Sequence, residues 1–208
     1  MVKSRATARR STKFMKTFKI VKPNTFFYIT SVTYNRVPIF KSDKACKALV
    51  AVFEEVRIRF PYKLVAYVIM PDHFHVLVNL KDGDISKWLL RVRGNSAKRI
   101  FAASDETFLQ KLTLDSPQKR NHKYALWQKD PSIVDVYSHK FLVQKTGYIH
   151  ANPVRAGLID HPAKWQWSSY HAHFPHETGE VAIEIDQRPY WTDEELRTVG
   201  EPPFGVGR

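Results

Sequence analysis

Two histidines separated by one phenylalanine, His73 and His75, are the residues of this sequence with the clearest capacity for chemistry. Side chains two apart in a β-strand share a face, so a strand over 73–80 would place both imidazoles side by side. The opposite, buried face would consist of Phe74, Val76, Val78 and Leu80. Two neutral imidazoles can bind one divalent ion, which would stay open to a third ligand, to water and to a substrate oxygen. The alternative is a purely structural, hydrogen-bonded role for both histidines.

Tyr148 and Asn152 are four residues apart, so on a helix ending at Pro153 they would lie one turn apart on the same side. Tyr148 could simply pack and Asn152 could cap the helix. Alternatively, Tyr148 is a nucleophile beside an amide oxygen that can complete a metal site. A phenol, with its pKa of about 10, becomes useful when the electrophile is a phosphodiester whose charge a metal neutralises. Such a transesterification would retain the bond energy in a phosphotyrosine link and would need no nucleotide cofactor.

The elements that must position these residues follow from the hydrophobic patterns. A strand is expected at 25–34, a helix from 43 to about 60, and a hairpin of strands at 63–70 and 73–80. A second helix at 85–103, a late strand at 124–128 and a third helix at 135–152, ended by Pro153, complete the order. The order β-α-β-β-α-β-α predicts an α+β fold with a ferredoxin-like antiparallel sheet packed with helices.

The chain of 208 residues carries 33 Lys and Arg against 20 Asp and Glu, a formal net charge of +13. Residues 1–22 hold eight basic residues and no acid, whereas 177–208 hold eight acids against three Arg. We therefore divide the chain into a basic N-terminal arm at 1–22, a central domain at 23–176 and an acidic C-terminal tail at 177–208. Without the tail the net charge is +18, which favours a polyanionic partner, nucleic acid first.

Composition excludes several other classes of protein. The 13 Phe, 9 Tyr and 5 Trp exclude a disordered chain. No apolar run approaches the roughly 18 residues of a membrane span, and the basic N-terminus lacks the apolar region of a signal peptide. With Cys46 as the one cysteine, no internal disulfide is possible. We expect a cytoplasmic protein with no membrane partner.

Cationic grooves combined with aromatic platforms bind single strands, and two basic segments fit this description. The candidate DNA-binding residues are Lys87, Arg91, Lys98 and Arg99 on the second helix, and Lys119, Arg120 and Lys123 beside Tyr124 and Trp127.

Two motifs together are more specific than either alone. Met70-Pro-Asp-His-Phe-His75 and Tyr148-Ile-His-Ala-Asn-Pro-Val-Arg-Ala-Gly-Leu158 resemble the tyrosine transposases of the HUH endonuclease class, most closely the REP-associated group. Supporting segments lie at 27–36, 126–128 and 165–170, and the resemblance covers about residues 24–174. The stretch 130–137 departs from the group because it lacks the histidine often found there, and the acidic tail lies outside the resemblance.

This resemblance implies a ferredoxin-like sheet, with His73 and His75 binding Mg²⁺ or Mn²⁺ and Asn152 at the position of the third ligand. Tyr148 would be the nucleophile and would form a 5′-phosphotyrosine on single-stranded, hairpin-forming DNA. The resemblance is compatible with either a monomer or a homodimer.

Three hypotheses follow. The first is a metal-dependent single-strand endonuclease and DNA strand transferase acting in transposition and recombination, and the second is a non-catalytic nucleic-acid-binding regulator with the same fold. The third is a metal hydrolase in which the histidines activate water and Tyr148 only packs. Occupation of every required catalytic position disfavours the second. A shortage of further ligands disfavours the third, since Asp72, the only close acid, would point to the face opposite His73 if the strand already runs through it.

Overall fold

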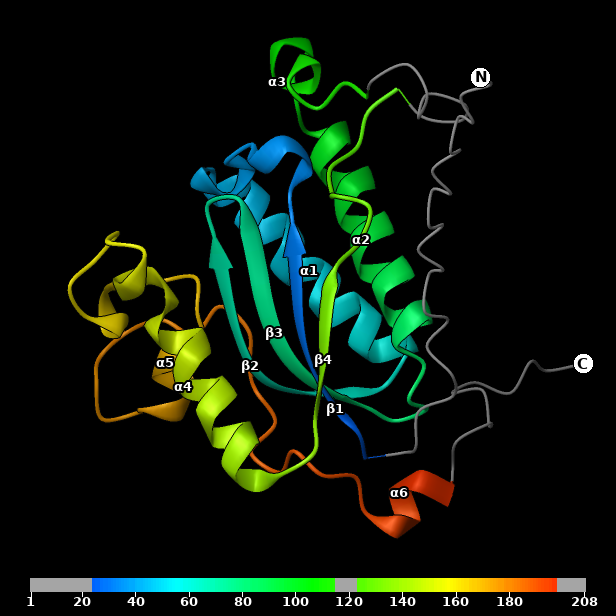
Figure 1. Cartoon of the computed structure of the whole chain (residues 1–208), viewed down its shortest axis with the longest axis vertical. Helices are drawn as coiled ribbons and strands as arrows, with labels where there is room; N and C mark the ends of the chain where they lie inside the picture. Colours follow the sequence, from blue (N-terminus) through cyan, green and yellow to red (C-terminus); the bar gives the residue numbers. More distant parts are fainter. Residues whose placement is uncertain (1–23, 115–122, 198–208) are drawn as a thin grey trace, which may run out of the picture.

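The computed structural model describes residues 24–114 and 123–197, and its centre is a four-stranded antiparallel sheet (Figure 1). The strands lie in the order β2-β3-β1-β4. Their bounds are Phe26–Val32 for β1, Tyr62–Met70 for β2, His73–Leu80 for β3 and Ser132–Val136 for β4. The central strand β1 pairs with both β3 and β4, which is the ferredoxin-like arrangement, so the predicted fold class is confirmed.

Three long helices accompany the sheet: α1 at Asp43–Arg59, α2 at Ile85–Ala102 and α4 at His139–Arg155. Short helices complete the described chain, with α3 at Glu106–Gln110, α5 at Tyr170–His173 and α6 at Asp193–Arg197. The first two long helices and the β2–β3 hairpin lie where the sequence predicts them. None of the helices in 24–114 and 123–197 is long and apolar enough to cross a membrane.

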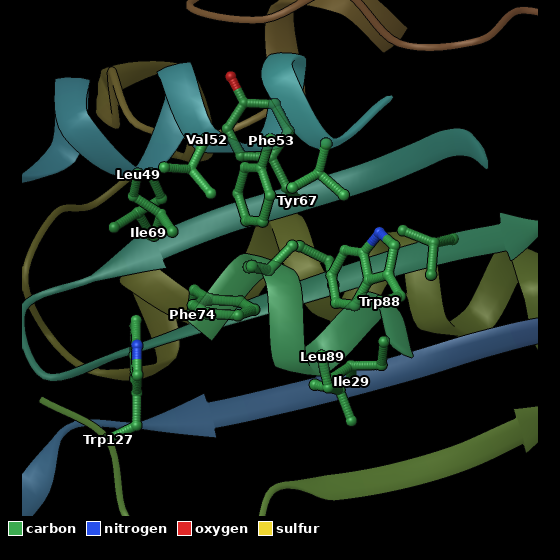
Figure 2. Close-up of a cluster of buried hydrophobic side chains, with 14 of the residues drawn as sticks. Ile29, Leu49, Val52, Phe53, Tyr67, Ile69, Phe74, Trp88, Leu89 and Trp127 are labelled. Atoms are coloured by element: carbon green, nitrogen blue, oxygen red, sulfur yellow. The ribbon is translucent and has the colours of Figure 1, made fainter. Parts of the chain in front are cut away.

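One face of the sheet is covered by α1 and α2. Leu49 and Phe53 of α1 and Trp88 of α2 pack against the β-strand residues Ile29 and Phe74 (Figure 2). The predicted buried face of β3 is part of this cluster, with Phe74, Val76, Val78 and Leu80 at 0–2% exposure. Burial of such side chains stabilises the fold by about 1.5–3 kcal/mol each.

The other face of the sheet is covered by α4. Leu142 and Ile149 on the underside of this helix join a second apolar cluster with Tyr28, Val68 and Leu77 of the strands. Both faces of the sheet are thus buried. Along β3, every second side chain joins the α1–α2 core, and the side chains between them point toward α4. This second face carries the histidine pair.

The predicted strand at 124–128 and the predicted start of the last helix were both wrong. Residues 132–136 form β4, while the earlier segment makes only isolated bridges, Thr33 with Trp127 and Thr113 with Tyr124. Trp127 is buried in the α1–α2 cluster, so its apolarity reflects packing and not a sheet ladder. The helix begins at His139, where the Ser138 hydroxyl accepts a hydrogen bond from Phe141 N.

Pro153 does not end α4, contrary to the prediction. The helix continues for two more residues to Arg155, and Ala156 N donates to Asn152 O at 2.9 Å, although proline removes one backbone donor and crowds the carbonyl of the preceding turn. The helix stops at Gly157, whose φ of +68° is left-handed and whose N–H bonds to Val154 O at 2.9 Å.

The C-terminal third of the chain covers the outer edge of β2. Ile69 N donates to Trp167 O at 2.8 Å, and Ser169 N donates to Tyr67 O at 3.0 Å. Further along, Asp186 N donates to Leu64 O at 2.8 Å.

The described part of the acidic tail also packs against the rest of the molecule. Ile183 is 3% exposed within the main core, and Glu195 pairs with Lys63 at 3.2 Å. The boundaries at 22/23 and 176/177 stay predictions. The basic arm at 1–22 lies outside the described residues.

Candidate active site

His73 and His75 lie side by side on the face of β3 that α4 covers, as their spacing predicts. Their ring centroids are 4.8 Å apart, with an interplanar angle of 80°. His75 is 6% exposed, whereas His73 at the start of the strand is half-buried. The pair therefore has one imidazole inside the fold and one at its margin.

Two hydroxyl groups of β1 hold the ring of His75. Thr30 lies opposite His75 in the β1–β3 register, and its Oγ1 is 2.7 Å from His75 Nδ1. The hydroxyl of Tyr28, whose ring stacks on the imidazole, lies 2.8 Å from the same nitrogen. Because Nδ1 is engaged by these hydroxyls, Nε2 is the nitrogen left to bind a cation.

Asp72 holds the ring of His73 in the corresponding way. Its Oδ1 lies 2.5 Å from His73 Nδ1, and its Oδ2 accepts a hydrogen bond from Arg36 at 2.9 Å. Burial acts to raise the pKa of the Asp72 carboxyl, but hydrogen bonds from His73 and Arg36 hold it below its usual value. Asp72 was expected to point away from His73 if it lay within the strand, but it lies in the turn before β3, so its carboxylate meets the His73 ring.

The loop after β1 brings Arg36 to this carboxylate. Asn35 and Arg36 both adopt left-handed conformations, with φ of 51° and 53°, which side chains other than glycine rarely do. Thr33 fixes the loop to the β2–β3 turn, since its N and Oγ1 donate to Asp72 O at 2.8 and 2.9 Å.

Tyr148 and Asn152 of α4 lie over the histidine pair. The Tyr148 ring centroid is 5.9 Å from that of His75 and 6.1 Å from that of Tyr28. Asn152 Nδ2 donates to Tyr148 O at 2.8 Å, so its Oδ1 is the atom suited to a cation. Tyr148 is 37% exposed, which leaves its ring accessible from outside. The structure thus brings all four predicted site residues together.

Two cations that the prediction of DNA-binding residues did not include lie against the Tyr148 ring. Lys145 Nζ is 5.6 Å from the ring centroid and 4.5 Å from that of Tyr28, and the Arg155 guanidinium is 5.3 Å from Tyr148. The sequence contains a signal for both: Lys145 precedes Tyr148 by three residues and Arg155 follows it by seven, spacings that place all three side chains near one another on a helix.

The buried histidine is neutral. Burial lowers the pKa of His75 to about 3, and the charge of His73 acts in the same direction, while the Asn152 side chain opposes them. A neutral imidazole has a free lone pair at neutral pH, which is the form that binds metals.

The donor set fits a divalent ion with open positions. Within 24–114 and 123–197 no three His, Cys, Asp or Glu side chains form a metal cluster, so the two imidazoles need the Asn152 amide oxygen to complete a set of three. Mn²⁺ accepts such a set of imidazole and oxygen donors, with its remaining positions left to water or substrate. Mg²⁺ prefers oxygen ligands, so the Asn152 amide oxygen is the donor that suits it best.

The predicted DNA-binding residues lie elsewhere. Lys87, Arg91, Lys98 and Arg99 are on α2, which lies on the other side of the sheet from α4 (Figure 1). Two of them have acidic partners, at 3.6 Å for Lys87 with Asp82 and 2.5 Å for Arg99 with Glu55. Lys123 pairs with Glu106 at 3.4 Å. Lys119 and Arg120 lie outside the described residues.

A ferredoxin-like sheet that sets a histidine pair against a helical tyrosine is the arrangement that the resemblance to tyrosine transposases implies. The family model described as "Transposase IS200 like" matches residues 22–130, more than half of the chain. The protein belongs to the IS200-like transposase family.

Three individual proteins are similar to this chain. A curated Haemophilus influenzae protein that carries the name REP-associated tyrosine transposase is 27% identical over 150 residues, covering 70% of this chain and 79% of that one. The solved structure of a REP-associated tyrosine transposase bound to a REP hairpin superimposes with a TM-score of 0.54 at 18% identity, covering 92% of this chain and 98% of the other. A Deinococcus radiodurans structure described as a transposase reaches a TM-score of 0.41 at 22% identity, over 60% of this chain and 87% of that one.

Proposed function

We propose that this protein cuts single-stranded DNA beside hairpins and rejoins strands through a covalent 5′-phosphotyrosine at Tyr148. A divalent ion, Mg²⁺ or Mn²⁺, would be held by His73, His75 and Asn152. The observation that carries the proposal is the position of Tyr148, an accessible phenol 5.9 Å from the His75 ring and flanked by two cations.

The chain's own residues would act on the phosphodiester as follows. The Tyr148 oxygen attacks phosphorus, the new P–O bond forms, and the bond to the 3′-oxygen of the preceding nucleotide breaks. The phenol proton passes to water and the departing 3′-oxygen takes a proton from water, so charge balances. Lys145 and Arg155 lie close enough to the Tyr148 ring to stabilise both the phenolate and the phosphate. Attack by the released 3′-hydroxyl of another strand end reverses the step and rejoins DNA.

A divalent cation, when bound, would neutralise charge on the phosphate and orient it. The residues around the histidines would keep that site in shape. Tyr28 and Thr30 fix the ring of His75, and Asp72 fixes the ring of His73. Outer partners of this kind orient a ligand and raise its basicity.

Hairpin DNA is proposed as the substrate because the REP-associated relative of the same fold was solved with a REP hairpin. The charge of this chain supports such a partner, since residues 1–176 carry a net +18.

The nucleophile can be tested by covalent capture. Labelled single-stranded DNA with a hairpin, incubated with the protein and Mn²⁺, should become attached and resist denaturing electrophoresis. Tyr148→Phe should abolish attachment and leave DNA binding largely intact. The matched control is Tyr190→Phe, which removes a hydroxyl from a half-exposed tyrosine packed edge-on against Phe26. Cleavage that survives in Tyr148→Phe would refute the nucleophile and favour the metal-hydrolase hypothesis.

The histidine pair needs its own variant. His73→Ala should lose attachment while keeping hairpin affinity, because the ring is at the margin of the fold and its removal leaves the core intact. If His73→Ala became attached to DNA at the same rate as the unmodified protein, the assignment of His73 as a metal ligand would be refuted. Tight hairpin binding without any attachment by the unmodified protein would favour the non-catalytic regulator.

A further inference from the structure

We infer that the substrate strand runs along the exposed face of α4, past Lys140, Gly147 and Arg155, and not along α2. The inference rests on the proposed function, because it names the surface that delivers DNA to the same tyrosine.

The charge on α4 is uncompensated. Its 17 residues contain no acid, and they include three cations, Lys140, Lys145 and Arg155. Across the part of the chain that the structure describes, none of these three cations forms an ion pair. A polyanion is the partner whose charge complements such a helix, because phosphates release their counterions when Lys and Arg replace them.

These positions share one side of the helix. At 100° per residue, residues 140, 147 and 155 lie within an arc of about 80° around the helix axis. The opposite side holds the buried residues Leu142 and Ile149. A rise of 1.5 Å per residue separates the end cations by about 22 Å, with Tyr148 midway between them. A strand gripped at both ends would pass over the nucleophile.

Apolar surface for bases accompanies the charge. Tyr137, directly before α4, is 87% exposed and lies 5.6 Å from the Phe141 ring, and Val143 is 57% exposed. Exposed aromatic rings beside cations are the features on which single strands stack.

The basic face of α2 is built differently. Two of its four candidate cations already have acidic partners, because Lys87 pairs with Asp82 and Arg99 pairs with Glu55. The sheet separates this face from Tyr148. A phosphate held on α2 would therefore lie on the wrong side of the molecule to be attacked.

Two glycines offer a matched steric test of the two surfaces. Gly147 on α4 and Gly94 on α2 are both exposed within helices, and a Cβ added at either meets no atom within 4 Å. A longer side chain at either position should therefore leave the free protein folded. Only the one beneath a bound strand should obstruct DNA.

The experiment measures equilibrium binding of a labelled oligonucleotide, a hairpin with single-stranded flanks, over a range of salt in EDTA. In Lys140→Gln/Arg155→Gln the slope of log affinity against log salt should fall by about 1.4, since each single-strand phosphate contact contributes about 0.7. Lys44→Gln/Lys47→Gln removes the same charge from the exposed surface of α1 and should leave the slope unchanged. Arg91→Gln/Lys98→Gln should also leave it unchanged. A fall for the α2 pair, with none for the α4 pair, would overturn the inference.

The steric pair completes the test. Gly147→Gln should weaken binding at least tenfold, whereas Gly94→Gln should not, and both should raise the midpoint of unfolding because glutamine favours helix over glycine. Equal affinities for the two would overturn the inference. Since binding in EDTA requires no cleavage, a chain without covalent attachment but with these α4 effects would refute the proposed function alone. Attachment at Tyr148 without α4 effects would refute only the strand path.

Discussion

Replacing Asp72 by asparagine should weaken Mn²⁺ binding without unfolding the domain. The bond between Asp72 Oδ1 and His73 Nδ1 is 2.5 Å long, and the carboxylate also holds Arg36 at 2.9 Å. Asparagine keeps the shape but removes the charge, and it offers one oxygen where the carboxylate offers two. The ring of His73 would then be less firmly oriented and less electron-rich toward a cation.

The size of the effect follows from the kind of contact. Loss of an outer partner of a metal-binding histidine typically lowers metal affinity by about 10–100-fold, which corresponds to about 1.4–2.7 kcal/mol. Arg36→Gln should have a smaller effect in the same direction, because it acts on His73 only through Asp72. Asp72 is a positioning residue, so the readout must be the metal itself and not turnover alone.

Titration with Mn²⁺, followed by the paramagnetic resonance signal of the free ion, measures this affinity directly. The matched control is Asp160→Asn, which breaks an exposed pair with Lys164 at 2.7 Å. Thermal unfolding without metal should be nearly the same for both variants. An Asp72→Asn protein that binds Mn²⁺ as tightly as the unmodified chain would refute the reasoning, and so would an equal loss in Asp160→Asn.

Two further predictions concern stability. Burial, with a smaller contribution from His173, lowers the pKa of His150 to about 3, so protonation favours the unfolded chain. The contribution of His150 should be full above about pH 6.5 and fall below it by up to about 1.4 kcal/mol per pH unit, and the buried His75 adds to the same fall. Urea unfolding at pH 7 and 5 measures this loss, and a flat profile would contradict the burial. Ile183→Ala should cost about 2–5 kcal/mol in urea unfolding, because Ile183 is 3% exposed, whereas the 41% exposed Val181 should tolerate alanine.

The sequence was sufficient to predict the relation of the two histidines. Strand alternation places Phe74 and Val76 in the core and the imidazoles on the other face, and this depends only on local geometry. Their partners could not be predicted in the same way. Thr30 meets His75 because of the register between β1 and β3, which pairs residues 45 positions apart in the chain.

Strand β4 shows why the end of the domain was harder to predict. The segment 124–128 contains more aromatic residues than 132–136 and therefore favoured the strand prediction. Leu126 and Trp127 are apolar because they fill the main core, while Ser132–Val136, which contains three β-branched residues, pairs with β1. Apolar residues that serve packing outside the sheet were therefore mistaken for a strand, and local propensity favoured the true one.

The sequence was least able to predict which of the basic residues are available to bind a partner. A count of lysines and arginines does not distinguish those with acidic partners from those without. Arg99 has Glu55 beside it, from a helix about forty residues earlier, whereas Arg155 lies against Tyr148. Only the folded chain separates a cation that is already neutralised from one that is available.

The cover over the edge of β2 has a consequence for synthesis of the protein. In β2 every residue except Lys63 is buried, and such a strand with an open edge readily pairs with other chains. Its cover comes from Trp167, Ser169 and Asp186, about a hundred residues later. On the ribosome the strand therefore emerges long before its protection is made. Chains that stop short of residue 167 should therefore aggregate through this edge. Only when the C-terminal segment has been synthesised and has folded against β2 is the protein protected from pairing with other chains.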